Sequence, residues 1–322
     1  MNLETRFTKQ VGIKYPIICG AMYPCSNPEL VAAVSEAGAI GIVQPLSLAY
    51  VHGHDFREGL KKIRTLTKNP YGVNIIVEQS SPAYEKRMRE YIEIALEEGC
   101  RFFITALGNP RWVVDLVKKH QSIVYHDVVA KKWAVKALDA GVDGLICVNN
   151  RAGGHAGILS PEDLFKETVS FGVPLIASGG IGDENDFKRA LEIGYDGIQM
   201  GTRFIATYEC HEKNNYKEAI CKADENDIVL TERVTGIPLS VINTPYVQQI
   251  GLKVGPIARW LLQHRYTKSW MRTWYGLNAI RDFKRISLNG GTSKDYWQAG
   301  KSVQHIHKIE SVKDIIQRFT QI

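Results

Sequence analysis

Glycines and a threonine hydroxyl group follow two short apolar segments in the middle of the chain. Ser178-Gly179-Gly180 comes after the first segment, and Gly201-Thr202 comes after the second. Glycine lets backbone N–H groups approach an anion closely, helix N-termini add a favourable dipole, and Thr202 offers a hydroxyl donor. Tight turns also need glycine, so neither pair is informative alone. Together they predict a site for a phosphate-bearing ligand.

A histidine between glycines offers acid–base chemistry. Residues 149–157 read Asn-Asn-Arg-Ala-Gly-Gly-His-Ala-Gly, directly after another apolar segment. Gly153 and Gly154 allow the backbone to lie flat against a planar ligand and leave the imidazole of His155 projecting over it. Histidine is the side chain whose unperturbed pKa suits proton transfer near neutrality. The alternative is a histidine that only caps its loop, but the flanking glycines favour a catalytic role.

Three further residues are expected at the same site. Ala21 and Met22 follow the first apolar segment, and Asn74 lies within the third. Methionine would pack softly against a planar ring, although Met22 as core filler explains the sequence nearly as well. No metal site is expected, because the six cysteines are scattered without a CxxC pair. This cysteine pattern also argues against a disulfide framework and suits a reducing cytoplasm.

Most of these residues follow strands, and Asn74 lies within one, in a regular alternation of strands and helices. The alternation predicts parallel strands with crossover helices, and eight repeats predict a closed (β/α)8 TIM barrel. The candidate residues then meet at the carboxyl ends of the strands, where barrel active sites form. The predicted strands are 16–19, 40–43, 71–77, 102–105, 122–125, 143–148, 173–178 and 197–200. The predicted helices are 27–37, 55–67, 81–98, one from 110, 130–140, 161–171 and 183–193.

The alternation stops after the eighth strand. Residues 1–207 and 286–322 are expected to form the barrel, with a final helix over 311–319, and 208–285 to form a largely helical, basic insertion packed on it. Residues 253–285 are rich in tryptophan and basic residues. Two interpretations stay open for them: a solvated helical cap, or a basic rim that faces an anionic substrate or an acidic partner.

The composition excludes several classes of protein. The chain has 322 residues, of which 44% are hydrophobic and 23% charged, as is typical of globular proteins. No apolar run approaches the roughly 18 residues that span a bilayer, and the N-terminus does not read as a signal peptide, so a cytoplasmic protein is expected. The net charge of +6 is too small to indicate nucleic-acid binding by itself.

Five segments, taken in order, resemble the nitronate monooxygenase (2-nitropropane dioxygenase) family of FMN-dependent TIM barrels. Flavin enoyl-ACP reductases and a flavin NADH:quinone reductase are related to this family. The resemblance covers about residues 10–310. The segments are Pro16-Ile17-Ile18-Cys19-Gly20-Ala21-Met22, Ala152-Gly153-Gly154-His155-Ala156-Gly157, Ile176-Ala177-Ser178-Gly179-Gly180-Ile181, Gln199-Met200-Gly201-Thr202-Arg203-Phe204 and Tyr296-Trp297-Gln298-Ala299-Gly300-Lys301-Ser302.

The resemblance implies a role for each candidate residue. FMN would be the cofactor, and His155 would polarise or deprotonate a nitroalkane or nitronate held over the flavin. The implied reaction oxidises alkyl nitronates with O2 to a carbonyl compound and nitrite. A homodimer is left open. The implied flavin contacts are Ala21, Met22 and Asn74 along the ring, Gly153 and Gly154 near the isoalloxazine, and Ser178, Gly179, Gly180, Gly201 and Thr202 around the phosphate.

Three departures from the family pattern limit what is carried over. Arg151 stands where many relatives have an acidic residue, Lys301 stands where the C-terminal motif often has glutamine, and the insertion is larger than in compact members. Both cations favour a small anionic substrate, or they are surface adjustments. The alternative function is an NAD(P)H-dependent flavin reductase of the enoyl-ACP or quinone type. A flavin-binding module without turnover and a barrel for another phosphate ester are further alternatives.

Overall fold

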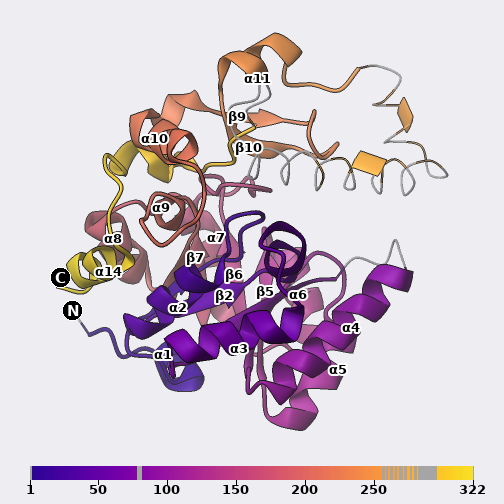
Figure 1. The fold of residues 1–322 in the computed structure, drawn as a ribbon, viewed down its shortest axis with the longest axis vertical. Helices are drawn as coiled ribbons and strands as arrows, with labels where there is room; N and C mark the ends of the chain where they lie inside the picture. The colour runs from indigo at the N-terminus through magenta and orange to yellow at the C-terminus, as the bar shows by residue number, and fades with distance from the viewer. Residues whose placement is uncertain are drawn as a thin grey trace.

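The computed structural model describes residues 2–77, 82–255 and 296–321, together with scattered residues between 258 and 281. Figure 1 shows that the N-terminal part of the chain forms a barrel. A second layer, made by residues after 207, lies over one end of the barrel. Among the described residues, none of the helices is both long and apolar enough to cross a membrane.

Eight parallel strands close into a barrel in the order in which they occur in the chain. Closure is made by β1 and β8, where Cys19 lies opposite Met200. The predicted (β/α)8 fold is therefore confirmed, and most strand bounds agree within two residues. The strands are β1 (Ile17–Cys19), β2 (Ile40–Val43), β3 (Gly72–Ile76), β4 (Phe102–Ala106), β5 (Ile123–Val128), β6 (Gly144–Val148), β7 (Leu175–Ser178) and β8 (Gly197–Met200).

Helices cover the outside of the barrel. Each strand up to β7 is followed by a helix that returns the chain to the opposite end. Asp183 caps α8 through its side chain, which accepts a hydrogen bond from the backbone of Asp186. A short N-terminal helix, α1 (Arg6–Val11), was not expected from the sequence. The outer helices are α2 (Pro28–Glu36), α3 (Phe56–Leu66), α4 (Pro82–Glu97), α5 (Arg111–Val117), α6 (Lys131–Asp139), α7 (Pro161–Thr168) and α8 (Glu184–Ile193).

The side chains that alternate along each strand divide the core into two parts. Ile18, Ile104 and Tyr125 point inward and form the packed interior of the barrel, which Phe7 of α1 closes at the amino ends of the strands. Outward-facing residues such as Val73 and Ile198 pack against the helices. Because the amino end is filled by apolar side chains, only the carboxyl end is left for a ligand.

The segment after β8 contains a β-hairpin, so the expectation of a largely helical insertion was wrong in part. β9 (Ile228–Thr231) pairs antiparallel with β10 (Leu239–Ile242). Each strand has only four residues, and β10 also bridges to distant parts of the chain at Gly154 and Gln298. Local periodicity carries no signal for such pairing. The helices described here are α9 (Thr202–Ile205), α10 (Asn214–Lys222), the 3₁₀ turn η4 (Glu225–Asp227) and α11 (Pro245–Ile250).

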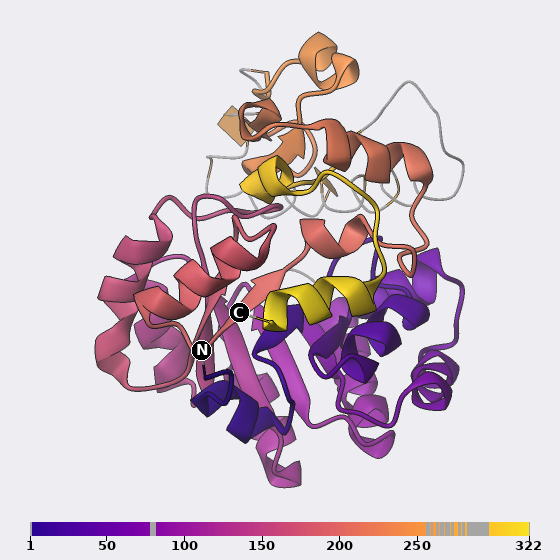
Figure 2. The same ribbon diagram turned by 90° about the vertical axis from the view of Figure 1, so that its left-hand side faces the viewer.

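The C-terminal segment returns to the barrel. A 3₁₀ turn, η5 (Lys301–His305), is followed by α14 (Val312–Thr320), which packs against α2 and α8 beside the N-terminus (Figure 2). The predicted final helix at 311–319 is thus confirmed. The predicted basic helical stretch at 253–285 lies largely outside the described residues, and so do residues 286–295 of the predicted barrel domain.

Candidate active site

The loops after β7 and β8 leave backbone donors free at the mouth of the barrel. Gly179 and Gly180 have φ values of 116° and 79°, a region that favours glycine. In the part of the chain that the structure describes, the N–H groups of Gly180 and Gly201 donate no hydrogen bond. Thr202 Oγ1 accepts a hydrogen bond of 3.0 Å from Gly300, which leaves its own proton for an acceptor. These donors fit the phosphate group that the sequence predicts.

Met22 and Gly201 lie close together across the barrel seam. A Cβ atom added to Gly201 would lie 3.3 Å from the Sδ atom of Met22, so the loop after β1 lies beside the loop after β8. Ser178 is buried and its hydroxyl accepts a 3.2 Å hydrogen bond from the amide of Gln199. Ala21 is half-buried, and Asn74 is buried on β3. Within the described residues, no hydrogen bond joins Asn74 to the other predicted residues.

Asn149, which the sequence did not single out for a role, holds two of these loops together. Its amide nitrogen donates to the carbonyl of Gly179 at 3.0 Å, and its amide oxygen accepts from the backbone of Arg151 at 2.8 Å. A Cβ atom on Gly179 would lie 2.5 Å from this same oxygen. Asn149 therefore positions the glycines after β7 against the histidine loop after β6. Its place at the end of a strand was the available signal.

The C-terminal motif (residues 296–302) packs directly on the histidine loop (residues 149–157). A Cβ atom on Gly300 would lie 2.5 Å from the backbone nitrogen of Gly153, and one on Gly153 would lie 2.9 Å from the nitrogen of Gly300. The backbone nitrogen of Lys301 donates to the carbonyl of Arg151 at 2.9 Å. Only glycine at both positions allows this approach, because backbone atoms cannot give way as a flexible side chain can.

The strand β10 lies between the histidine loop and the C-terminal motif. Ser240 N donates to Gly154 O at 2.8 Å, and Ile242 N donates to Trp297 O at 2.8 Å. Three segments from distant parts of the sequence therefore meet at the mouth of the barrel. Backbone hydrogen bonds hold these three segments together. No single sequence motif reveals these contacts.

His155 projects from this loop and meets the insertion. Its Nε2 lies 3.3 Å from the hydroxyl of Thr235, and that hydroxyl donates its proton to the carbonyl of Ile237 at 2.9 Å. Thr235 can then only accept, so Nε2 carries the proton of the neutral imidazole and Nδ1 keeps its lone pair. The residue is exposed, but desolvation of the ring lowers the pKa of His155 from its usual value of 6.5. A neutral ring with a free Nδ1 can accept a proton at pH 7.

Arg151 makes an internal ion pair above the loop after β7. Its guanidinium lies 2.9 Å from the carboxylate of Glu225, and its side chain covers Gly180, where an added Cβ would lie 2.7 Å from Nε. Glu225 belongs to the insertion. The charge of Arg151 is therefore partly balanced by this chain itself, and it links the insertion to the loop after β7.

The sequence matches the family model for nitronate monooxygenase over residues 4–321, nearly the whole chain. The chain belongs to the nitronate monooxygenase family.

The names of similar proteins describe different activities. It is 28% identical to a (3aS,4S,5R,7aS)-5-hydroxy-7a-methyl-1-oxo-octahydro-1H-indene-4-carboxyl-CoA dehydrogenase from Rhodococcus jostii, across 77% of this chain and 68% of that protein. It is 25% identical to a probable nitronate monooxygenase from Staphylococcus saprophyticus, across 100% and 99% of the two chains.

Solved structures agree with the fold. The structure of FabK from Thermotoga maritima superposes with a TM-score of 0.80 at 28% identity and covers 99% of this chain and 96% of that one. Nitroalkane oxidase from Streptomyces ansochromogenes has a TM-score of 0.76 at 18% identity, covering 98% and 96% of the two chains, and supports the fold alone. As a nitronate monooxygenase family member, the chain is a flavin-dependent oxidoreductase.

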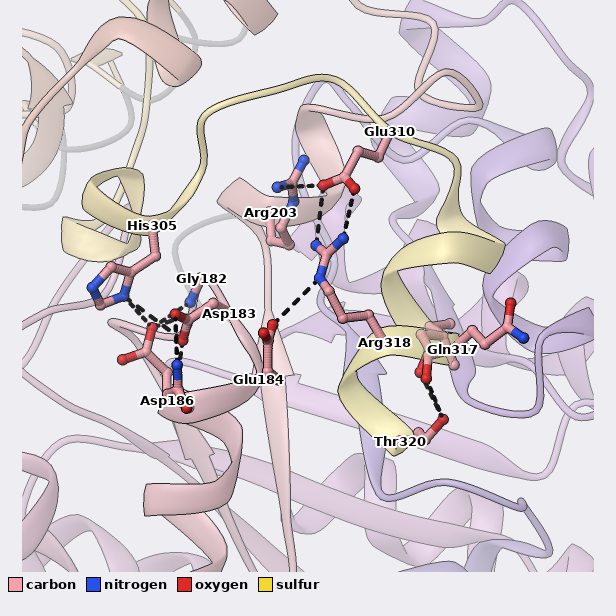
Figure 3. Close-up of polar contacts among 12 residues, drawn as sticks. Gly182, Asp183, Glu184, Asp186, Arg203, His305, Glu310, Gln317, Arg318 and Thr320 are labelled. Carbon is pink, nitrogen blue, oxygen red and sulfur yellow. Dashed lines mark hydrogen bonds and ion pairs between the residues drawn. The ribbon is translucent and has the colours of Figure 1, made fainter. Parts of the chain in front are cut away.

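Below the loops of this oxidoreductase, the start of α8 is fastened to the C-terminal turn η5. Asp186 Oδ2 accepts from Gly182 N at 2.8 Å and lies 2.7 Å from Nδ1 of His305 (Figure 3). Asp183 and Asp186 cap each other's backbone at the helix start. The three side chains lie close enough together to hold a cation, but these hydrogen bonds already account for their arrangement. We assign them a structural role.

The residue after Thr202 anchors the same region from within the protein. Arg203 is 1% exposed, and its guanidinium donates to the carbonyl groups of Ala206 and Lys308 and pairs with Glu310 at 3.4 Å. Arg318 of α14 binds Glu310 as well and reaches Glu184 of α8 (Figure 3). The loop after β8 is therefore held to the C-terminal helix by a buried ionic network.

Proposed function

We propose that the protein is an FMN-dependent nitronate monooxygenase that oxidises alkyl nitronates with O2 to a carbonyl compound and nitrite. The observation that carries this proposal is His155, neutral and with a free Nδ1, on a glycine loop beside free phosphate donors. The family assignment and the probable nitronate monooxygenase from Staphylococcus saprophyticus support it. The free thiols suit the cytoplasmic location that belongs to this proposal.

FMN fits the donor set at the mouth of the barrel. In the proposal, the N–H groups of Gly180 and Gly201 and the hydroxyl of Thr202 hold its phosphate, with Ser178 and Gly179 completing the loop. Met22, Ala21, Asn74 and the Gly153-Gly154 backbone line its ring. When bound, FMN supplies the electron transfer between the nitronate and O2.

The remaining steps belong to residues of this chain. His155 Nδ1 accepts a proton from the carbon next to the nitro group, which converts a neutral nitroalkane to its nitronate in place. The neutral form of the ring is available for this step because its pKa is lowered by desolvation. Arg151 and Lys301 favour a small anionic substrate in this proposal, although the ion pair with Glu225 offsets part of the charge of Arg151.

Replacing His155 tests the catalytic assignment. We expect His155→Asn to lower turnover of nitroalkanes by about 10²- to 10⁴-fold, because a positioned general base contributes an effect of that size. FMN should stay bound, because the loops after β7 and β8 are unchanged. Steady-state nitrite release and the flavin content of the purified variant measure the two effects. Unchanged nitrite release in His155→Asn would remove His155 from the mechanism.

Replacing Thr235 tests the proposed proton arrangement on His155. Thr235→Val keeps the shape of the side chain but removes the acceptor for Nε2–H, so Nδ1–H imidazole becomes populated. We expect turnover to fall about fivefold, the effect of one hydrogen bond. Nitrogen-15 shifts of the ring should report the second tautomer, and Thr235→Ser should restore the wild-type pattern. A single, unchanged tautomer in Thr235→Val would show that Thr235 does not set it.

An anaerobic absorbance experiment tests the function as a whole. Purified protein is mixed with propionate 3-nitronate in one sample, and with NADH or NADPH in others. The proposal requires that the nitronate reduce the bound flavin and that the pyridine nucleotides leave it oxidised. Bleaching by NADH or NADPH, without a response to the nitronate, would contradict it.

The second candidate is an NAD(P)H-dependent flavin reductase that acts on an enoyl thioester or a quinone. The indene-4-carboxyl-CoA dehydrogenase from Rhodococcus jostii favours a thioester, since the substrate in its name carries coenzyme A. Coenzyme A and NADPH are both anionic, as the basic residues near the mouth would require. The same absorbance experiment separates the two candidates.

A further inference from the structure

Asp127 lies at the carboxyl end of β5, where its side chain faces the interior of the barrel. Tyr125, two residues earlier on the same strand, belongs to the packed barrel interior. Side chains two residues apart on a strand point to the same face, so Asp127 stands one layer above Tyr125, at the mouth. The carboxyl end of a barrel strand is the position from which side chains reach ligands in this fold.

The carboxyl group of Asp127 lacks the partners that two other aspartates beside barrel strands have. Its Oδ1 atom is buried and accepts no hydrogen bond within the described residues, while the residue as a whole is only half-buried. Asp143 and Asp196, at the opposite ends of their strands, each accept a backbone N–H and pair with a cation. A buried acceptor without a donor destabilises the fold, so its presence at a site calls for a ligand.

A second unused acceptor faces the same space. Gln199 lies between Ile198 and Met200, which pack outward against the helices, so its side chain points into the barrel from β8. Its Nε2 donates to Ser178, and its buried Oε1 accepts nothing within the described residues. The inner wall therefore presents two acceptors that lack donors, from β5 and from β8. This set is complementary to a ring that carries N–H groups.

The surroundings of Asp127 keep its carboxyl close to the balance between its two protonation states. Burial raises the pKa of Asp127 from 3.8 to about 7. A hydrogen-bond donor from a ligand would favour the charged form and offset this burial.

We propose that Asp127 contacts the ligand at the mouth of the barrel and accepts a hydrogen bond from an N–H group of its ring, as the imide of a flavin offers. This inference rests on the proposed function, because that function places a flavin ring here. It assigns a ligand contact to a strand that no sequence motif marks.

Two measurements on Asp127→Ala separate a ligand contact from a structural role. The first is the dissociation constant of FMN, from quenching of FMN fluorescence on titration with apoprotein. The second is the melting temperature of the apoprotein. We expect the dissociation constant to rise at least tenfold, because a charge-assisted hydrogen bond is lost. The melting temperature should stay equal or rise, because the unpaired buried acceptor is gone.

Two more variants complete the experiment. Asp127→Asn retains an acceptor oxygen and should recover most of the affinity for FMN. Asp115→Ala makes the same change at an exposed position on α5 and should alter neither measurement. If Asp127→Asn binds FMN as weakly as Asp127→Ala, the acceptor role is wrong.

The remaining outcomes are distinct. Equal affinities in wild type and Asp127→Ala would overturn the contact while leaving the FMN assignment intact. Weaker FMN binding together with a lower melting temperature of the apoprotein would show that Asp127 has a structural role. This outcome would also overturn the proposed contact. Failure of the wild-type apoprotein to bind FMN would overturn the proposed function itself, and the inference with it.

Discussion

Glu310→Gln is expected to lower the free energy of unfolding by about 3 kcal/mol, since removing one partner of a buried ion pair leaves the other charge uncompensated. Arg203 is 1% exposed and has Glu310 as its carboxylate partner at 3.4 Å. Arg318, which binds the same carboxylate through two nitrogens, would lose part of its anchoring as well. Urea unfolding of the two proteins at pH 7 measures the difference.

The effect of Glu310 should depend on pH in a defined direction. Burial is the largest influence on its carboxyl group and raises the pKa, but hydrogen bonds from Arg318 and Lys308 and the charges of Arg318 and Arg203 outweigh it. The pKa in the folded protein is therefore below the usual 4.5. A lowered pKa contributes stability that is present above the unfolded value and lost as the pH falls through the folded one. The difference in the free energy of unfolding between wild type and Glu310→Gln should become smaller below pH 4.5.

A matched change at an exposed pair serves as the control. Glu192 lies 3.9 Å from Lys188 on α8, and both side chains are more than half exposed, at 57% and 54%. Glu192→Gln should change stability by less than about 0.5 kcal/mol. If Glu310→Gln proves equally mild, the buried network does not hold the C-terminal helix to the loop after β8.

Gly300→Ala is expected to lower the affinity for FMN at least tenfold and to reduce turnover further. The new Cβ would lie 2.5 Å from Gly153 N and 2.8 Å from Arg151 O, so the C-terminal motif must move away from the histidine loop. Such overpacking costs about 1–3 kcal/mol, and it also breaks the hydrogen bond from Gly300 N to Thr202. FMN titration and nitrite release measure the two effects.

Gly255→Ala is the control for this change, because a Cβ there would meet no atom of the described residues within 4 Å. It should leave flavin binding and turnover unchanged. Wild-type affinity in Gly300→Ala would mean that the two glycine segments separate without consequence for the site.

The barrel could be predicted because its signal is local and repeated. Short apolar strands, helix caps such as Asp183 and glycines at helix ends recur along residues 16–200, and each indicates an element without reference to distant residues. The glycine pairs and His155 stand at strand ends, so the repeat itself placed them at one mouth. Most bounds shifted by one or two residues, and β5 continued three residues beyond its predicted end, to Val128.

The contacts that complete the site could not be predicted, because each joins residues far apart in the sequence. Thr235 meets His155 across 80 positions, and Gly300 meets Thr202 across 98. The β9–β10 hairpin depends on such partners too. Asp127 was missed for another reason: it sits inside an apolar strand with no motif, and only the missing hydrogen-bond partner of its Oδ1 singles it out.

The position of β10 between the histidine loop and the C-terminal motif has a consequence for synthesis on the ribosome. All eight barrel strands lie before residue 201, but Ser240 and Trp297 emerge later. After Gly154, about ninety more residues must therefore be translated before its hydrogen-bond partner Ser240 is made. The motif at Gly300 is made later still. A nascent chain can carry the whole barrel sequence before it can assemble the mouth. Premature termination after residue 201 and before residue 310 would leave the barrel strands encoded but remove Glu310, the counter-charge of Arg203.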